Sequence, residues 1–199
     1  MIGPSDARVF IQRLFVLAAF VSTLWVIQSV NWAIGYQLNF AFGLIPREAA
    51  GLDGIVLMPL LHGSFEHLLS NTPPLVVMGG LLAATATRAL IAVNAVIVAL
   101  GGALVWLFGS SAIHIGASGL IFGWFGFLVA RGLLDRSLAT LGVATSVGLI
   151  YGTMVWGVLP GQPGVSWEAH LFGTIAGVFA ALLVRTHVHR PGVRNVGRK

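Results

Sequence analysis

The chain has 199 residues, of which 57% are hydrophobic and only 9% are charged, with a formal net charge of +5 and a mean hydropathy of +0.92. A soluble domain carries about 25% charged residues, so this chain cannot cover a water-exposed surface and is expected to cross a membrane several times. Cysteine is absent, which excludes disulfides and thiolate metal sites. The cations gather at the two ends and in short loops, a distribution that suits membrane orientation better than nucleic-acid binding.

Six apolar runs, bounded by charges, glycines or prolines, follow one another and predict spanning helices. They cover residues 14–34, 65–86, 89–108, 118–130, 138–159 and 168–184. Residues 35–63 are mixed in character, and we expect a long loop with short interfacial helices there. Pro73 and Pro74 lie near the start of the second run and are expected to kink it unless they fall in its first turn. The predicted fold class is an all-α membrane protein, a six-transmembrane-helix bundle without a second domain.

The loop arginines indicate how this bundle is oriented. Arg47 is the only cation in the loops of one side, and all the others fall on the opposite side. Cytoplasmic loops carry the excess of Lys and Arg, so we expect a cytoplasmic N-terminal segment (residues 1–13), a six-helix domain (14–184) and a basic cytoplasmic tail (185–199). The expected location is a bacterial plasma membrane. The acidic residues that mark the outer side are Glu48, Asp53, Glu66 and Glu168.

A Gly-x-Ser-Gly turn, Gly116-Ala117-Ser118-Gly119, runs directly into the fourth apolar helix. Ser118 would sit at the mouth of that helix with an accessible hydroxyl, and its own N–H would be one of the unpaired donors of the helix start. This is the local geometry of a serine nucleophile with a built-in oxyanion donor. Glycine and serine are also common packing residues in membrane helices, so the motif needs partners at the same depth.

Polar side chains do gather at one membrane depth. With the N-terminus inside, the second, fourth and sixth helices all begin at the outer side, and those three starts carry His62, His67 and Asn71, then Ser118, then His170. Residues His67 and Asn71 share a helix face because they are four apart. Ionisable residues in membrane helices are costly and usually functional. We therefore expect Ser118 to lie in a polar cavity open to the outer side, lined by His62, His67, Asn71 and His170, with the loops 109–117 and 160–167 as its rim.

Glycine spacing predicts that the fourth and sixth helices pack closely. His170, Gly173 and Gly177 share one face of the sixth helix, and Gly119 and Gly123 form a small-residue surface on the fourth. Close backbone contact would bring the His170 ring within reach of the Ser118 hydroxyl. Acidic residues are absent from the interior of the second, fourth and sixth helices, beyond their first residues, so the expected machinery is a Ser–His dyad, with His67 and Asn71 available as oxyanion donors.

Other interpretations of these residues remain open at this point. Ser118 can be a packing serine, and His170 an interfacial histidine bonded to a carbonyl. Three histidines at one depth can bind zinc, but no carboxylate or cysteine joins them at ligand spacing, so we expect no metal and no cofactor. A transporter or channel would place ionisable residues deep in its helices. Here the polar residues stop near one surface, and we interpret the main exception, Asn94, as an interhelical hydrogen bond.

Taken together, these motifs resemble those of the rhomboid family of intramembrane serine proteases. The resemblance rests on His62-x4-His67-x3-Asn71, on Gly116-Ala117-Ser118-Gly119 and on His170-x-x-Gly173, and it spans residues 14–184. It implies that Ser118 is the nucleophile and His170 the general base, and that His67, Asn71 and the Ser118 N–H bind the oxyanion. The supporting residues that it implies are His62, Gly116, Gly119, Gly173 and Phe122, the last as the aromatic ring that packs on the catalytic histidine.

The implied substrates are transmembrane proteins, cut in or near their spanning segments, and the implied surroundings are membrane lipid without nucleic acid. Many rhomboids carry a Trp-Arg pair in the first loop, whereas residues 43–48 here read Gly-Leu-Ile-Pro-Arg-Glu. The family's packing of that loop against lipid is therefore not carried over. The alternative function is that of a catalytically inactive rhomboid-like protein that binds transmembrane clients.

Overall fold

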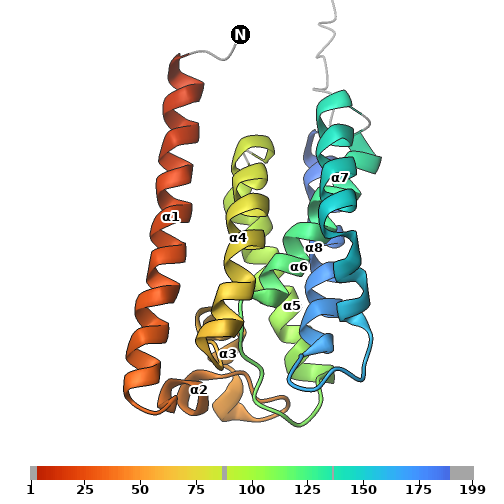
Figure 1. Ribbon diagram of the computed structural model, residues 1–199. Coiled ribbons are helices and arrows are strands. Elements are labelled where there is room, and N and C mark those ends of the chain that lie inside the picture. The colour runs from red at the N-terminus through yellow and green to blue at the C-terminus, as the bar shows by residue number, and fades with distance from the viewer. Residues whose placement is uncertain (1–3, 87–88, 136, 189–199) are drawn as a thin grey trace, which may run out of the picture.

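The computed structural model describes residues 4–86, 89–135 and 137–188, and these ranges form a bundle of long helices without β-strands (Figure 1). Six helical segments in the described ranges are long and apolar enough to cross a membrane. The prediction of an all-α, six-helix membrane bundle is confirmed. The long helices are α1 Pro4–Ala33, α4 Phe65–Thr85, α5 Leu90–Phe108, α6 Ser118–Asp135, α7 Leu138–Tyr151 and α8 Trp167–Val188.

Helices α1, α6 and α7 show the largest differences from the apolar runs, and α8 also extends beyond its run, to Val188. Helix α1 begins at Pro4, because helical structure continues beyond the apolar part of the segment. Helix α6 continues to Asp135, beyond the apolar run that ends at residue 130, and an i,i+4 ion pair of 2.7 Å between Arg131 Nε and Asp135 Oδ2 stabilises its last turn. Helix α7 ends at Tyr151 and is followed by a 3₁₀ helix, Gly152–Val158, so its span is not one regular α-helix.

The prolines of the second span lie inside α4 rather than in its first turn. The α-helix nevertheless runs on through Pro73 and Pro74 to Thr85. Of the cations behind the predicted orientation, Arg88, Arg136 and the tail residues 189–199 lie outside the described residues.

The long segment between α1 and α4 crosses the end of the bundle at which α4, α6 and α8 begin, the lower end in Figure 1. We call this the site end. The segment contains the short helices α2 (Gln37–Phe42) and α3 (Gly54–Leu57) and two 3₁₀ turns, Ala49–Gly51 and Met58–Leu60. Hydrogen bonds fix it to the bundle: Leu44 pairs with His114 in an isolated antiparallel bridge, and Arg47 donates to the Gly109 carbonyl at 2.8 Å.

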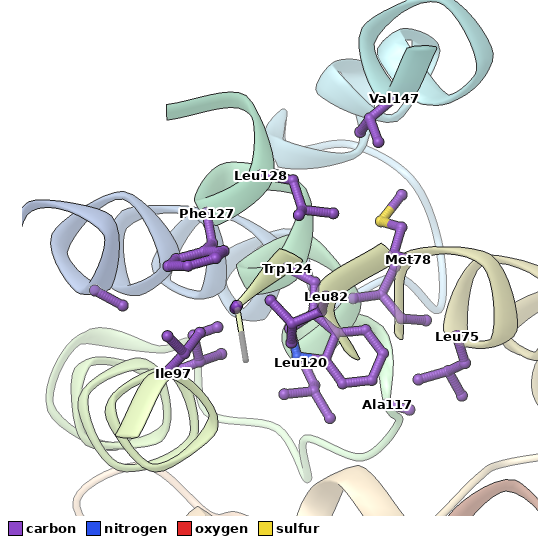
Figure 2. Packing of buried hydrophobic residues seen from close by; sticks show 14 of the residues in the cluster. Leu75, Met78, Leu82, Ile97, Ala117, Leu120, Trp124, Phe127, Leu128 and Val147 are labelled. Atoms are coloured by element: carbon purple, nitrogen blue, oxygen red, sulfur yellow. The ribbon is translucent and has the colours of Figure 1, made fainter. Parts of the chain in front are cut away.

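Helix α6 lies at the centre of the bundle, packed against α4, α5, α7 and α8. Figure 2 shows its side chains in a continuous apolar core with residues of α4, α5 and α7. The Trp124 indole donates to Asn94 Oδ1 on α5 at 2.9 Å, which confirms the interhelical hydrogen bond expected for Asn94. The core side chains labelled in the view are Leu75, Met78, Leu82, Ile97, Ala117, Leu120, Trp124, Phe127, Leu128 and Val147.

The contact between α6 and α8 is the most extensive helix pairing in the described chain. It depends on two glycines of α8 that face the backbone of α6. A Cβ atom on Gly173 would overlap the Gly119 carbonyl oxygen, and one on Gly177 would overlap the Gly123 carbonyl oxygen. The close approach predicted from glycine spacing is therefore confirmed. Since the contact starts one residue after Ser118, it fixes the beginnings of both helices side by side.

The α6–α8 contact generates a stability prediction. A Gly177→Ala substitution should lower the free energy of unfolding by about 1–3 kcal/mol, because the added methyl group must displace the α6 backbone. Gly148→Ala on α7 is the matched control, since its Cβ would meet no atom within 4 Å. Thermal unfolding in detergent measures both variants. Equal melting temperatures for the two variants would contradict the assigned role of this contact.

Candidate active site

An open cavity of about 610 Å³ lies at the site end. Its walls come from the first turns of α4 and α8, from the loop 109–117 before α6, from the loop 159–166 before α8, and from Ser118. This agrees with the rim expected from the two loops. The lining residues are Gly63, His67, Ser70, Asn71, Ser110, Ala112, Ile113, His114, Ile115, Ser118, Gly164, Val165, Ser166, Trp167, Glu168 and His170.

Ser118 is the first residue of α6, and the turn before it is tightly constrained. Gly116 has φ +117°, a conformation that L side chains rarely adopt, and its N–H donates to the Met58 carbonyl at 2.9 Å. A Cβ on Gly116 would lie 2.8 Å from His67 Cε1 and 3.7 Å from Ser118 Oγ. Glycine is thus required both for the backbone turn and for the space that the imidazole and the hydroxyl occupy.

His170 lies in the first turn of α8 with its ring held on two sides. Its Nδ1 lies 2.9 Å from the Gly157 carbonyl oxygen. Since a carbonyl only accepts, Nδ1 carries the proton, and Nε2 of the neutral ring is left as a free base. The Phe122 ring stacks on the imidazole, with centroids 4.0 Å apart and planes 7° apart. The stacking places Phe122 where the resemblance expected it.

Backbone packing brings these two residues together. A Cβ on Gly119 would lie 3.3 Å from the Ala169 carbonyl oxygen. Ser118 and His170 are the chain neighbours of these two contacting residues, and both line the cavity. A hydroxyl and an unprotonated imidazole nitrogen at one polar cavity can act as a nucleophile and its general base.

Helix α4 contributes His67 and Asn71 to the cavity lining. Ser64 caps the helix by accepting the His67 N–H at 3.1 Å, which orients the first turn. Asn71 is 6% exposed, and its Nδ2 has no hydrogen-bond partner among the described residues. An unpaired buried amide costs about 1–3 kcal/mol. Such a donor at the cavity wall is available to an oxygen atom that arrives with a ligand.

His62 lies behind the cavity and does not line it, so the expectation that it forms part of the wall is wrong. The side chain is fully buried, and its Nε2 accepts the Ala117 N–H at 3.4 Å. Its ring meets the His67 ring edge-on, with centroids 5.0 Å apart. His62 therefore supports the turn before Ser118 and the His67 ring from behind. His62 does not line the cavity because it lies in the loop ahead of α4 and not on the helix face that carries His67.

Three cavity residues were missed as site residues in the sequence: His114, Ser166 and Glu168. Glu168 served only as a marker of the outer side, yet it is 4% exposed and its Oε1 accepts the Ser110 N–H at 3.1 Å. His114 Nδ1 lies 2.6 Å from Ser166 Oγ. One sequence signal could have found Ser166: it stands just before a predicted helix start, three residues ahead of Ala169, which is a helix-capping position.

Comparison with known proteins agrees with the geometry. Residues 50–187 match the Rhomboid domain family. The chain belongs to the rhomboid family and is an integral multi-pass membrane protein. It is similar to uncharacterised proteins of Mycobacterium tuberculosis and Mycobacterium bovis, each 38% identical over 177 residues, which cover 84% of this chain and 73% of theirs. An uncharacterised protein of Mycobacterium leprae is 36% identical over 178 residues, covering 84% of this chain and 70% of its own length.

The buried His62 ring should make stability depend on pH. Burial, and then the neighbouring His67 ring, lower the pKa of His62 from 6.5 to about 3. Between these two values the unfolded chain binds a proton that the folded protein does not. Stability contributed by the neutral ring is therefore complete above pH 6.5 and is lost progressively as pH falls toward 3.

A His62→Asn variant should remove this dependence. We expect the wild type to be more stable than the variant at pH 7.5, and the difference to shrink by about 3 kcal/mol at pH 4.5, given 1.4 kcal/mol per pKa unit over the two units below 6.5. Denaturant unfolding in detergent at a series of pH values measures it. His67 and His170 are present in both proteins, so their contributions to the pH dependence largely cancel in the difference between wild type and variant. Parallel pH curves for the two proteins would disprove the assigned pKa shift.

Proposed function

We propose that this protein is an intramembrane serine endopeptidase that hydrolyses peptide bonds in or near the transmembrane segments of membrane-protein substrates. The observation that carries the proposal is the sharing of one polar cavity by Ser118 and by a His170 whose hydrogen bond to Gly157 leaves Nε2 as the basic atom. Membership of the rhomboid family supports the same reaction class. The working location is a bacterial plasma membrane with both termini cytoplasmic, supported by the arginine distribution and by mycobacterial relatives.

The acylation step follows from the named atoms. His170 Nε2 takes the hydroxyl proton as Ser118 Oγ attacks the scissile carbonyl carbon, and the carbonyl oxygen gains the negative charge. Asn71 Nδ2, the His67 ring and the Ser118 N–H are the donors proposed for that oxyanion. The imidazolium then gives its proton to the leaving amine as the peptide C–N bond breaks. This leaves an ester between the substrate acyl group and Ser118.

Deacylation repeats the sequence with water. His170 takes a proton from a water molecule, the hydroxide attacks the ester, and Ser118 leaves with the proton returned by His170. Water must reach this point despite the surrounding lipid. A cavity of about 610 Å³ holds many molecules of about 30 Å³ each. Ser118 must also reach the scissile carbonyl of the substrate. A substrate helix therefore has to unwind locally, because that carbonyl is otherwise hydrogen-bonded within the helix.

The dyad is tested by labelling detergent-solubilised protein with a fluorophosphonate probe. Wild type should be labelled, while Ser118→Ala and His170→Ala should be unlabelled and should not cleave a model transmembrane substrate in liposomes. Ser70→Ala is the matched control, because Ser70 also lines the cavity and should leave labelling intact. A folded wild type that is neither labelled nor active would instead favour the inactive, client-binding alternative.

The oxyanion site is tested by Asn71→Ala. Loss of one oxyanion donor should lower kcat about 10²–10³-fold, and KM should change little because the donor acts mainly on the transition state. Steady-state cleavage in liposomes gives both constants. Asn94→Ala is the control, since it removes a hydrogen bond to Trp124 on α6 outside the cavity lining. An Asn71→Ala enzyme with wild-type kcat would remove Asn71 from the oxyanion hole.

A further inference from the structure

The proposed reaction leaves three polar side chains of the cavity unused, and two of them, His114 and Glu168, are buried. They belong to His114, Ser166 and Glu168, and we call them, with Ser110, the rim network. His114 comes from the loop that ends at Ser118, while Ser166 and Glu168 come from the start of the helix that carries His170. The network therefore joins the two segments on which the nucleophile and the base depend.

His114 occupies the centre of the network and uses both ring nitrogens. Nε2 lies 3.1 Å from the Ser110 carbonyl oxygen, so in the neutral ring Nε2 carries the proton. Nδ1, 2.6 Å from Ser166 Oγ, then accepts the serine hydroxyl proton. The backbone of His114 pairs with Leu44 in both directions, at 3.0 and 2.8 Å. His114 is 3% exposed, and its two ring contacts and two backbone hydrogen bonds fix its position.

Ser166 and Glu168 anchor the other side of the network to α8. Ser166 Oγ accepts the Ala169 N–H at 3.3 Å and so caps the helix. Glu168 lies in the first helical turn, where a carboxylate is favoured by the helix dipole. Its Oε1 accepts the Ser110 N–H, which belongs to the loop of His114. Two independent connections thus tie this loop to the first turn of α8.

The first turn of α8 needs such an anchor because the loop before it provides little. Residues 160–164 are exposed. Gly161 and Gly164 have φ +108° and +74°, and a Cβ on either would meet no atom within 4 Å. Backbone packing on Gly119 and the contacts of the His170 ring hold the first turn of α8 against α6 and the fifth span. The rim network adds the direct side-chain ties between that turn and the α5–α6 loop.

We propose that His114, Ser166 and Glu168 are positioning residues that set the Ser118 hydroxyl against the His170 imidazole. This inference rests on the proposed protease function. A displacement of about 1 Å in reacting groups can cost about 10²-fold in rate. Loss of either connection should therefore slow the attack by Ser118 while leaving substrate binding nearly unchanged.

Glu168 provides the sharpest test, because charge and hydrogen bonding can be separated there. Glu168→Ala loses the acceptor for the Ser110 N–H, whereas Glu168→Gln keeps an oxygen at the same place without the charge. We expect Glu168→Ala to lower kcat and the fluorophosphonate labelling rate about 10–100-fold with KM nearly constant, and Glu168→Gln to restore both to within about threefold. A Gln variant as slow as the Ala variant would overturn positioning in favour of a role for the charge itself.

A second pair of variants, at Ser166, tests the proposal even if Glu168→Ala does not fold. Ser166→Thr keeps the hydroxyl that meets His114 and the Ala169 N–H, and Ser166→Ala loses it. Thr should label close to the wild-type rate and Ala should be slow. Asn94→Ala is the control for general destabilisation, since it breaks a hydrogen bond outside the cavity lining. If Asn94→Ala slows labelling as much as Glu168→Ala at equal loss of melting temperature, the network is merely structural.

A distance measurement decides the proposal without any enzyme activity. The chain has no cysteine, so nitroxide labels can be placed at Ala112→Cys on the loop and Ile175→Cys on α8, both exposed positions. Pulsed electron resonance should give a narrow distance distribution, broadened by Glu168→Ala and narrowed again by Glu168→Gln. An unchanged distribution in Glu168→Ala would refute the network as an anchor. If the wild type neither reacts with the fluorophosphonate probe nor cleaves substrate, the protease function is refuted, while the distance result still decides whether the network is an anchor.

Discussion

The contact on which the rest of this structure depends is the close approach of the α6 and α8 backbones. Lipid tails are as apolar as leucine, so apolar side chains gain nothing by leaving lipid for another helix, and packing must come from shape. Gly173 and Gly177 supply that shape by leaving room for the carbonyl oxygens of Gly119 and Gly123. A side chain at either position would separate the helices. Shape complementarity here both stabilises the bundle and places Ser118 beside the helix that carries His170.

Helix starts provide much of the remaining chemistry. Helices α4, α6 and α8 all begin at the site end, so their unpaired N–H groups and polar first turns meet around one cavity. Polar side chains at this depth avoid the cost that they would incur deeper in the hydrocarbon. The core seen in Figure 2 then packs mainly through apolar side chains, and its Trp124 donates the hydrogen bond to Asn94 that joins α6 to α5.

The sequence predicted the parts of this arrangement that follow from periodicity and depth. Helix number, the glycine faces and the gathering of Ser118, His67, Asn71 and His170 at one cavity all follow from spacing along apolar runs. Their chemical roles remain proposals. Helix ends were less predictable, because a helix can continue beyond its apolar stretch, as α1 does at Pro4.

What the sequence did not reveal depends on contacts between loops. Glu168 was interpreted only as a marker of the outer side, from the distribution of charges, whereas it is buried and its Oε1 accepts the Ser110 N–H from a distant loop. His62 was placed on the cavity wall because its depth matches that of His67, but depth does not say which way a loop residue faces. Such pairings join residues more than fifty positions apart, and no periodic signal records them.

The end of the fifth span offers a physical reason why the proposed Ser–His dyad needs no acidic third residue. The 3₁₀ helix Gly152–Val158 ends just after Gly157, so the Gly157 carbonyl is one of the acceptors that a helix end leaves without an internal partner. His170 Nδ1 supplies the missing donor at 2.9 Å, and the carbonyl in return fixes the tautomer of the ring. A helix C-terminus is also the end that favours a positive charge, which the imidazolium acquires during the proposed attack. The irregular end of this span thus provides, through backbone alone, the orientation that a carboxylate supplies in a triad.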